Sequence, residues 1–171
     1  LTRDQYPSWL YPVKQGATTI WERWDGQKPD GSFQDKGMNS FNHYAYGAVG
    51  DWMYEVVAGI DVDQLVPGYK HILIRPHPGG GFTHVKARHE TMYGSVSTDW
   101  KIVDNRYDLA VEVPANTTAT IELPNAALES VTEGGKQVPV GFKARQDGHL
   151  VVLSIGSGRY SFSYPWKTST N

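Results

Sequence analysis

The sequence lacks cysteine, which excludes disulfide bonds and thiolate chemistry without fixing a compartment. No run of Lys or Arg is longer than two residues, and the net charge of −2 argues against a nucleic-acid partner. No apolar stretch approaches the about 20 residues that cross a bilayer, so we expect no membrane partner. No signal peptide is visible and the chain begins with Leu1, so we expect a processed N-terminus or a piece of a longer chain, whose location, periplasmic or secreted, stays open.

What is present suffices for a hydrophobic core and falls into two patterns. A chain of 171 residues with 39% hydrophobic content predicts one domain or two small ones. Four of the six Trp and a helical pattern of small residues precede Val66, whereas short alternating runs rich in Val, Thr, Gly and Pro follow it. We therefore predict a helical domain over residues 1–66 and an all-β domain over residues 67–171.

The most unusual stretch is Trp21-Glu22-Arg23-Trp24-Asp25. If it is extended, Glu22 and Trp24 share one face, and Trp21 and Arg23 share the other. An indole stacks on the apolar face of a pyranose, and a carboxylate beside it can act on a hydroxyl, a water or the glycosidic oxygen. We therefore predict Glu22 as a catalytic residue and Trp21 and Trp24 as substrate-binding residues. A Trp-rich structural anchor is the alternative that these five residues leave open.

A long loop and a helix follow this stretch. Turn-forming residues predict an exposed loop to about Asn39, and loops of this length are often functional. Apolar residues at three- and four-residue spacing predict a helix over Ser40–Ala58, with Asn39 or Ser40 as its cap and Gly59 as its end. His43 would lie in the first turn. The loop could fold back and bring Glu22 and His43 together, so we predict that His43 binds substrate, with a capping His as the alternative.

The second half predicts an antiparallel β-sandwich, because short alternating runs recur about every ten residues. Trp100 and Tyr107 alternate with core positions and should be buried. The remaining histidines have no zinc-site spacing, and Asp61-Val62-Asp63 lacks the further ligands of a calcium loop, so no metal or other cofactor is predicted. The predicted strands lie at residues 72–75, 82–90, 94–103, 107–113, 119–123, 131–138, 149–155 and 160–164.

Two motifs resemble those of bacterial-type α-L-rhamnosidases, the inverting enzymes of glycoside hydrolase family seventy-eight. They are the run GATTIWERWD and the segment NSFNHYAYGAV, and the resemblance extends from about Pro7 to Pro165. It implies the helical remnant of an α/α six-hairpin barrel followed by the antiparallel β-sandwich. It also implies that Glu22 matches the general base that activates water, and that His43 matches a histidine that contacts rhamnose. It assigns no role to Trp21 or Trp24.

The general acid of that family lies in an acidic motif that this chain does not contain. The resemblance therefore implies a C-terminal piece of an enzyme that removes terminal α-L-rhamnose from glycosides or polysaccharides. Its partner would be the missing N-terminal part of the catalytic domain, and the isolated chain should be inactive. The apolar faces of the predicted helix could also lead to self-association. The alternative is a non-catalytic carbohydrate-binding β-sandwich module, which exposed aromatic residues on the sandwich would favour.

Overall fold

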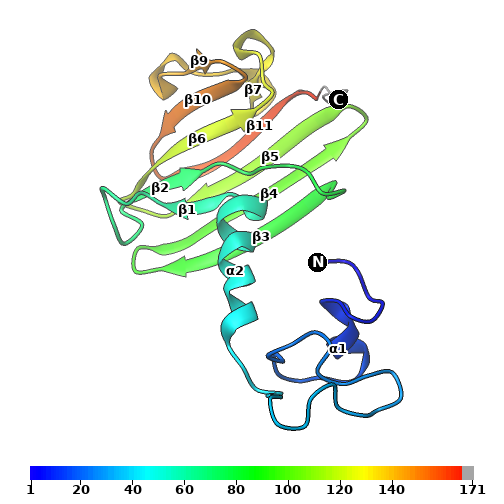
Figure 1. Cartoon of the computed structure of the whole chain (residues 1–171). Coiled ribbons are helices and arrows are strands. Elements are labelled where there is room, and N and C mark those ends of the chain that lie inside the picture. The colour runs from blue at the N-terminus through cyan, green and yellow to red at the C-terminus, as the bar shows by residue number, and fades with distance from the viewer. Residues whose placement is uncertain (167–171) are drawn as a thin grey trace. The chain divides into compact units, whose positions relative to one another are not determined.

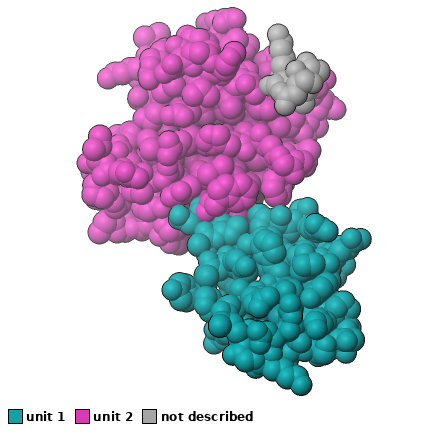
Figure 2. Space-filling model, in the orientation of Figure 1, with its two compact units in different colours: residues 1–51 teal, residues 52–171 magenta. Residues whose placement is uncertain are grey.

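The computed structural model describes residues 1–166. The chain divides into two compact units, Leu1–Asp51 and Trp52–Asn171 (Figure 2). Residues 167–171 of the second unit lie outside the described part. The predicted domain boundary at residue 66 stays a prediction. Each unit is described by itself below.

The first unit consists mainly of loops, and α1 (Leu10–Lys14) is its one short α-helix before residue 45 in the described chain. Gly16 ends this helix with a left-handed φ of 82°, which glycine adopts without a Cβ penalty. Its N–H donates to the Val13 carbonyl, and the next N–H donates to the Pro12 carbonyl, both at 3.0 Å. This Schellman arrangement satisfies the last carbonyls of the helix.

The predicted helix over Ser40–Ala58 begins five residues late. It runs through a 3₁₀ turn η1 (Ala45–Ala48), the α-helical α2 (Val49–Trp52) and a π-helical turn η2 (Met53–Ala58), visible around the α2 label in Figure 1. The prediction of Asn39 or Ser40 as its cap is wrong, because residues 40–43 pair with residues 19–22 instead. Gly59, with φ 76°, ends the helix as predicted.

The second unit is a sandwich of two sheets that share one core (Figure 1). The first sheet contains, in order, β1 (Ile60–Val62), β2 (His71–Ile74), β6 (Thr118–Pro124), β10 (Leu150–Ile155) and β9 (Arg145–Asp147). The second contains β3 (His84–Thr91), β4 (Gly94–Val103), β5 (Arg106–Val113), β11 (Gly158–Pro165), β7 (Thr132–Glu133) and β8 (Lys136–Gln137). Two 3₁₀ turns, Leu128–Ser130 and Val140–Phe142, connect strands.

Most strands lie where the alternating pattern predicts them, but one pairing differs. β2 and β6 are parallel, so the expectation of a wholly antiparallel sandwich is wrong at this pair. The reason is that the chain leaves β2 for the other sheet, so no hairpin sets the direction of its neighbour. Trp100 and Tyr107 are fully buried, as predicted.

The end of the helix is joined to the sandwich core by two side chains of β4. Trp100 Nε1–H donates to the Val57 carbonyl and Thr98 Oγ1–H donates to the Ala58 carbonyl, each at 2.8 Å and buried. Helix C-termini leave such carbonyls without intrahelical partners. The sandwich therefore caps the helix, and Gly59 turns the chain directly into β1.

Candidate functional site

Two segments of the first unit run beside each other and bring Glu22 and His43 onto one backbone strip. The Glu22 N–H donates to the Ser40 carbonyl at 2.9 Å, and the His43 N–H donates to the Ile20 carbonyl at 2.8 Å. The intervening loop thus folds back on the Glu22 segment. The functional roles of Glu22 and His43 stay predictions, but their backbones share this pairing.

The Glu22 carboxylate is half-buried and held on one side. Its Oε2 accepts a hydrogen bond from the Ser40 backbone N–H at 3.2 Å. Its other oxygen, Oε1, has no hydrogen-bond partner among residues 1–166. One oxygen is therefore fixed by the backbone while the other remains available to a water or a substrate hydroxyl.

His43 is held in one neutral tautomer by the start of the helix. Its Nδ1 accepts a hydrogen bond from the Ala45 N–H at 3.2 Å. A ring nitrogen that accepts cannot carry the proton, so the neutral ring carries it on Nε2. The imidazole also stacks on the Tyr44 ring, with centroids 5.3 Å apart and planes inclined by 3°. His43, which precedes the N-cap residue Tyr44, therefore accepts the Ala45 N–H at the helix start and presents an N–H donor.

The two indoles beside Glu22 do not follow the extended pattern, because residues 20–26 form bends and a turn, not a strand. Trp21 is 8% exposed and meets Phe41 edge-on at 4.8 Å between centroids. Trp24 is 36% exposed and lies 5.6 Å from Trp9 and 5.2 Å from Tyr46. Trp21 thus anchors the unit, as the structural alternative allowed, and Trp24 belongs to a cluster of three rings. Substrate binding by either stays a prediction.

Arg23 is bound to Asp25, not to Glu22. Its Nε and Nη2 donate to Oδ1 and Oδ2 of Asp25 at 3.0 and 3.2 Å. This bidentate pair raises the pKa of Arg23 above its ordinary value. The guanidinium therefore stiffens the turn after Trp24.

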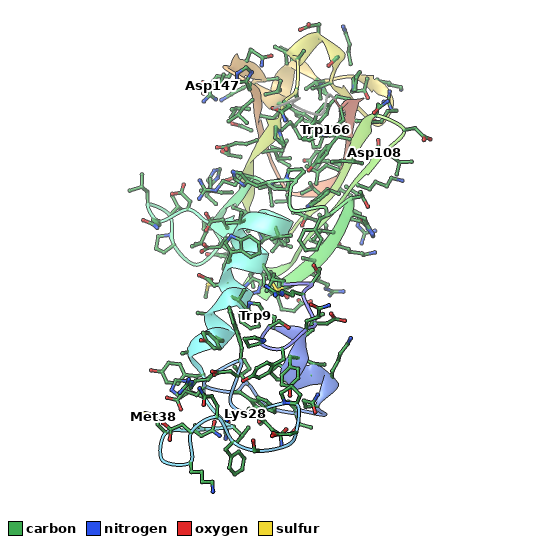
Figure 3. All side chains as sticks on the ribbon, turned by 45° about the vertical axis from the view of Figure 1, so that its right-hand side comes forward. Trp9, Lys28, Met38, Asp108, Asp147 and Trp166 are labelled. Carbon is green, nitrogen blue, oxygen red and sulfur yellow. The ribbon has the colours of Figure 1, made fainter. Side chains whose placement is uncertain are left out.

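Asn39 and Gly26 close the loop that separates Glu22 from Ser40, and the sequence did not mark them as a pair. Asn39 Nδ2–H donates to the Gly26 carbonyl at 3.0 Å, and the Gln34 N–H donates to the same oxygen at 3.1 Å. Lys28 and Met38 lie on this loop (Figure 3). The turn residues around Asp25-Gly26 predicted a loop, but no local signal reveals a contact across thirteen positions.

An apolar cavity of about 310 Å³ adjoins this strip within the first unit. Both indoles that flank Glu22 in the sequence contribute to its wall. Indole faces are suited to the C–H faces of sugars, and a cavity of this size is comparable to known ligand pockets. Its lining consists of Trp9, Pro12, Val13, Ala17, Thr18, Thr19, Ile20, Trp21 and Trp24.

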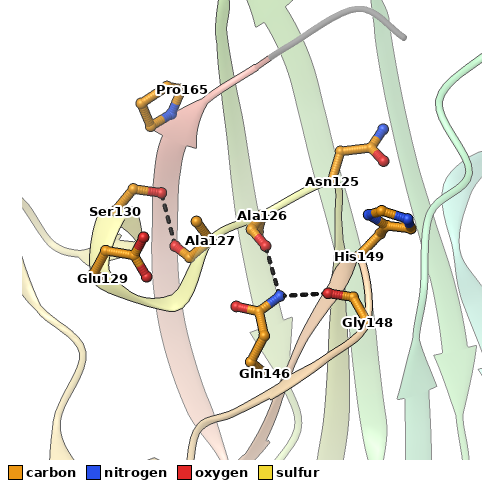
Figure 4. A pocket seen from close by; sticks show the side chains of 9 residues that line it. All are labelled: Asn125, Ala126, Ala127, Glu129, Ser130, Gln146, Gly148, His149 and Pro165. Carbon is orange, nitrogen blue, oxygen red and sulfur yellow. Dashed lines mark hydrogen bonds between the residues drawn. The ribbon is translucent and has the colours of Figure 1, made fainter.

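The second unit holds a more polar cavity of about 590 Å³ (Figure 4). Gln146 spans it: Nε2 contacts the carbonyls of Ala126, Gly148 and Leu150 at 3.0 Å, and Oε1 accepts from the Leu128 N–H at 2.9 Å. Its carboxamide is thus fully used by the protein's own backbone. No Trp, Tyr or Phe is among its described lining residues, so this cavity lacks the aromatic platform of a sugar-binding surface.

Two further site classes find no support in the described chain. Residues 1–166 contain no cluster of three or more His, Cys, Asp or Glu side chains that could hold a metal ion. None of the helices in that range is both long and apolar enough to cross a membrane.

Comparison with known proteins adds two family matches. Residues 1–57 match the bacterial alpha-L-rhamnosidase 6 hairpin glycosidase domain, and residues 59–138 match the bacterial alpha-L-rhamnosidase C-terminal domain. The two matches meet at the turn around Gly59, where the helix enters the sandwich. They confirm the resemblance that the two sequence motifs indicated.

Individual relatives agree. The chain is 43% identical over 163 residues to an alpha-L-rhamnosidase of Streptomyces avermitilis, covering 95% of this chain and 15% of the relative. It is 48% identical over 131 residues to an alpha-L-rhamnosidase of Formosa agariphila, covering 77% of this chain and 14% of the relative.

Two solved structures share the fold. The Streptomyces avermitilis alpha-L-rhamnosidase, solved with L-rhamnose, matches with a TM-score of 0.80 and 42% identity over 95% of this chain and 15% of its own. The alpha-L-rhamnosidase of Dictyoglumus thermophilum matches with a TM-score of 0.79 and 33% identity over 96% of this chain and 18% of its own. The chain thus spans less than a fifth of the length of these relatives.

Proposed function

Because the chain belongs to the bacterial α-L-rhamnosidase family, we propose that it is part of an enzyme that removes terminal α-L-rhamnose from rhamnosides with inversion. In this proposal residues 1–57 are a remnant of an α/α six-hairpin barrel, and the rest of that barrel is the partner of this chain. Glu22 is the general base. His43 binds the sugar.

The observation that carries the proposal is the way the protein holds Glu22. Inverting hydrolysis uses two carboxyl groups about 6.5–9.5 Å apart, one to deprotonate water and one to protonate the leaving oxygen. The Ser40 amide holds Oε2 of Glu22 and leaves Oε1 for the attacking water.

His43 and the apolar cavity fit the substrate in this proposal. The Nε2–H of His43 would donate a hydrogen bond to a sugar hydroxyl. The indoles that line the cavity would contact the apolar face of the sugar. A site that loses such a donor leaves the bound hydroxyl unpaired and binds the sugar less tightly.

We assign the general acid to the longer enzyme, because the carboxylates nearest to Glu22 in the sequence have other partners. Asp25 is paired with Arg23, and Asp35 accepts the N–H groups of Gly37 and Met38. Hydrogen bonds from Ser32 hold the pKa of Asp30 below its ordinary value, whereas a general acid has to remain protonated. These contacts support an acid contributed by the longer enzyme.

The test is Glu22→Gln in the complete enzyme that contains this chain. Gln keeps the shape but cannot take a proton, so we expect kcat on an aryl α-L-rhamnoside to fall by about three orders of magnitude or more with little change in KM. Glu129→Gln, the same change at an exposed position of the sandwich, is the matched control and should be as active as wild type. Activity of Glu22→Gln within tenfold of wild type would remove Glu22 from the mechanism.

The 171-residue chain alone should hydrolyse nothing, and it should either self-associate or have a mobile first segment. It has a base without an acid, and large apolar side chains such as Val13, Phe33 and Met38 are exposed in its first unit. Sedimentation velocity with an assay on the aryl rhamnoside checks both statements. A well-ordered monomer would contradict the second expectation, and turnover that disappears in Glu22→Gln would contradict the first.

A binding module is the alternative, and the sandwich does not favour it. The aromatic residues that could have formed a sugar platform, Trp100 and Tyr107, are buried, and the cavity in Figure 4 lacks one. We therefore retain the hydrolase as the proposed function.

A further inference from the structure

We propose that Asn39 is a positioning residue for Glu22, acting through the backbone amide of Ser40. The inference rests on the proposed function, since it concerns how the base is held. Glu22 receives one backbone hydrogen bond on its carboxylate, from the residue that directly follows Asn39. The Glu22 N–H holds the Ser40 carbonyl, and Asn39 fixes the residue on the loop side of the Ser40 amide.

The Asn39 carboxamide closes the loop at its base. Its Nδ2–H donates to the Gly26 carbonyl at 3.0 Å, a bond that spans the entire loop between the two segments. The exposed loop itself carries short turns stabilised by its own residues, such as the Lys28 N–H to the Ser32 carbonyl at 2.8 Å. Without the Asn39 bond, the loop end that carries the Ser40 amide has no side-chain connection to Gly26.

Gly26 is shaped to admit this carboxamide. A Cβ at position 26 would lie 2.8 Å from Asn39 Oδ1, which is closer than real Cβ contacts allow, and at a tight 3.3 Å from the Arg23 carbonyl oxygen. Gly26 does not have a left-handed φ, so space and not backbone conformation requires glycine here. Asn39 Oδ1 is itself buried and has no hydrogen-bond partner within residues 1–166.

A buried amide oxygen without a partner costs free energy, so packing alone is a poor reason to have Asn at this position. The bond that the side chain does make sets the position of the loop end. Misplacing a catalytic group by about 1 Å can reduce the rate about 100-fold. Asn39 would therefore affect the chemical step without contacting the sugar.

The experiment compares Asn39→Ala and Asn39→Asp with Asn42→Ala in the complete enzyme. Asp keeps the size of Asn but loses the Nδ2 donor, whereas Asn42 is an exposed asparagine in the same segment. We expect both Asn39 variants to lower kcat about 100-fold with KM within about threefold of wild type, and Asn42→Ala to be normal. Gly26→Ala should reproduce the loss, and Gly37→Ala, whose added Cβ would meet only an ordinary contact at 3.6 Å, should not.

A double-mutant cycle separates positioning from general destabilisation. If Asn39 acts through Glu22, Asn39→Ala should change the residual rate of the Glu22→Gln enzyme by less than about twofold. A full 100-fold loss in that background, or an active Asn39→Ala enzyme beside an inactive Glu22→Gln enzyme, would overturn the inference and leave the proposed function standing. An active Glu22→Gln enzyme would instead overturn the proposed function.

A measurement that does not depend on catalysis tests whether Asn39 holds the Ser40 amide in place, whatever the kinetic results. In the complete protein that contains this chain, hydrogen exchange of the Ser40 amide should accelerate at least about tenfold in Asn39→Ala and in Glu22→Ala, which lacks an acceptor, but not in Asn42→Ala. Unchanged protection of that amide in Asn39→Ala would show that the carboxamide does not hold the loop end, and the inference would be wrong.

Discussion

The two units of this chain are stabilised in different ways. Of the hydrophobic residues that are buried in the described chain, only Tyr11 and Trp21 lie in residues 1–51, while the sandwich buries a continuous core from both sheets. The first unit is held mainly by hydrogen bonds between irregular backbone segments, and it contains the candidate site. The second unit is held by regular strand pairing and contains no candidate site that we favour.

This difference has a physical meaning. In a sheet, alternate side chains pack into one hydrophobic core that stabilises the fold. The residue types along its strands therefore reflect core packing. Irregular backbone can hold a carboxylate by a main-chain amide and leave its other oxygen free, which regular pairing does not allow. The candidate site therefore lies in the unit with less buried apolar surface, and we expect that unit to depend most on the rest of the proposed longer protein.

The largest expected effect tests the junction between helix and sandwich. A Cβ on Gly59 would lie 2.1 Å from Pro76 N and 2.5 Å from Pro76 Cα, and the φ of Gly59 is 76°. Left-handed backbone and overpacking together should lower the free energy of unfolding of Gly59→Ala by about 2–5 kcal/mol. Urea unfolding followed by tryptophan fluorescence measures it. Gly79→Ala, where nothing lies within 4 Å, is the control, and equal stability of the two variants would contradict the tight packing at this junction.

A smaller effect compares two buried tyrosines inside the sandwich. Tyr164 Oη–H donates to the Pro124 carbonyl at 2.8 Å, whereas the buried Tyr107 hydroxyl has no partner within residues 1–166. At pH 7, Tyr164→Phe should cost about 1 kcal/mol, because it removes a hydrogen bond, and Tyr107→Phe should be neutral or stabilising. Thermal unfolding measures both. The reverse order of stability would contradict the assigned contacts.

The same two residues sharpen the comparison at alkaline pH. Burial raises the pKa of both Tyr107 and Tyr164 far above the ordinary value of 10.0. Below pH 10 the folded and the unfolded chain both keep these protons, so the free energy of unfolding does not depend on them. As pH rises beyond it, the unfolded chain releases protons that the folded sandwich retains, and stability falls by at most about 1.4 kcal/mol per pH unit for each tyrosine. Each Phe variant should therefore flatten this decline, and an unchanged slope would contradict the burial argument.

The sandwich was largely predictable because its signal is local. The alternation of Val96, Thr98 and Trp100 along one strand identifies the buried face directly. The parallel pairing of β2 with β6 was not predictable in the same way, because neither strand carries information about a neighbour reached after a crossing to the other sheet. Short strands such as β1 and β9 carry too few residues for an alternating pattern.

The first unit was predictable in its residue types and less so in its geometry. The Glu22 and His43 segments were expected to meet, and their backbones do pair. The extended arrangement of Trp21 and Trp24 and the helix start at Ser40 were wrong, because hydrogen bonds between residues 19–22 and 40–43 override local helix and strand preferences. Sequence periodicity carries no signal for such irregular pairing.

The sequence by itself determined that the chain has two parts of different residue pattern. It also determined most strands of the sandwich and contained the motifs that indicate a rhamnosidase. Only the tertiary structure decided that Ser40 holds one oxygen of Glu22, that Arg23 belongs to Asp25, and that Asn39 reaches Gly26. The reason is the range of the forces involved. Apolar periodicity is written into neighbouring residues, whereas a hydrogen bond between segments depends on where a loop brings its two ends, and no local pattern records that.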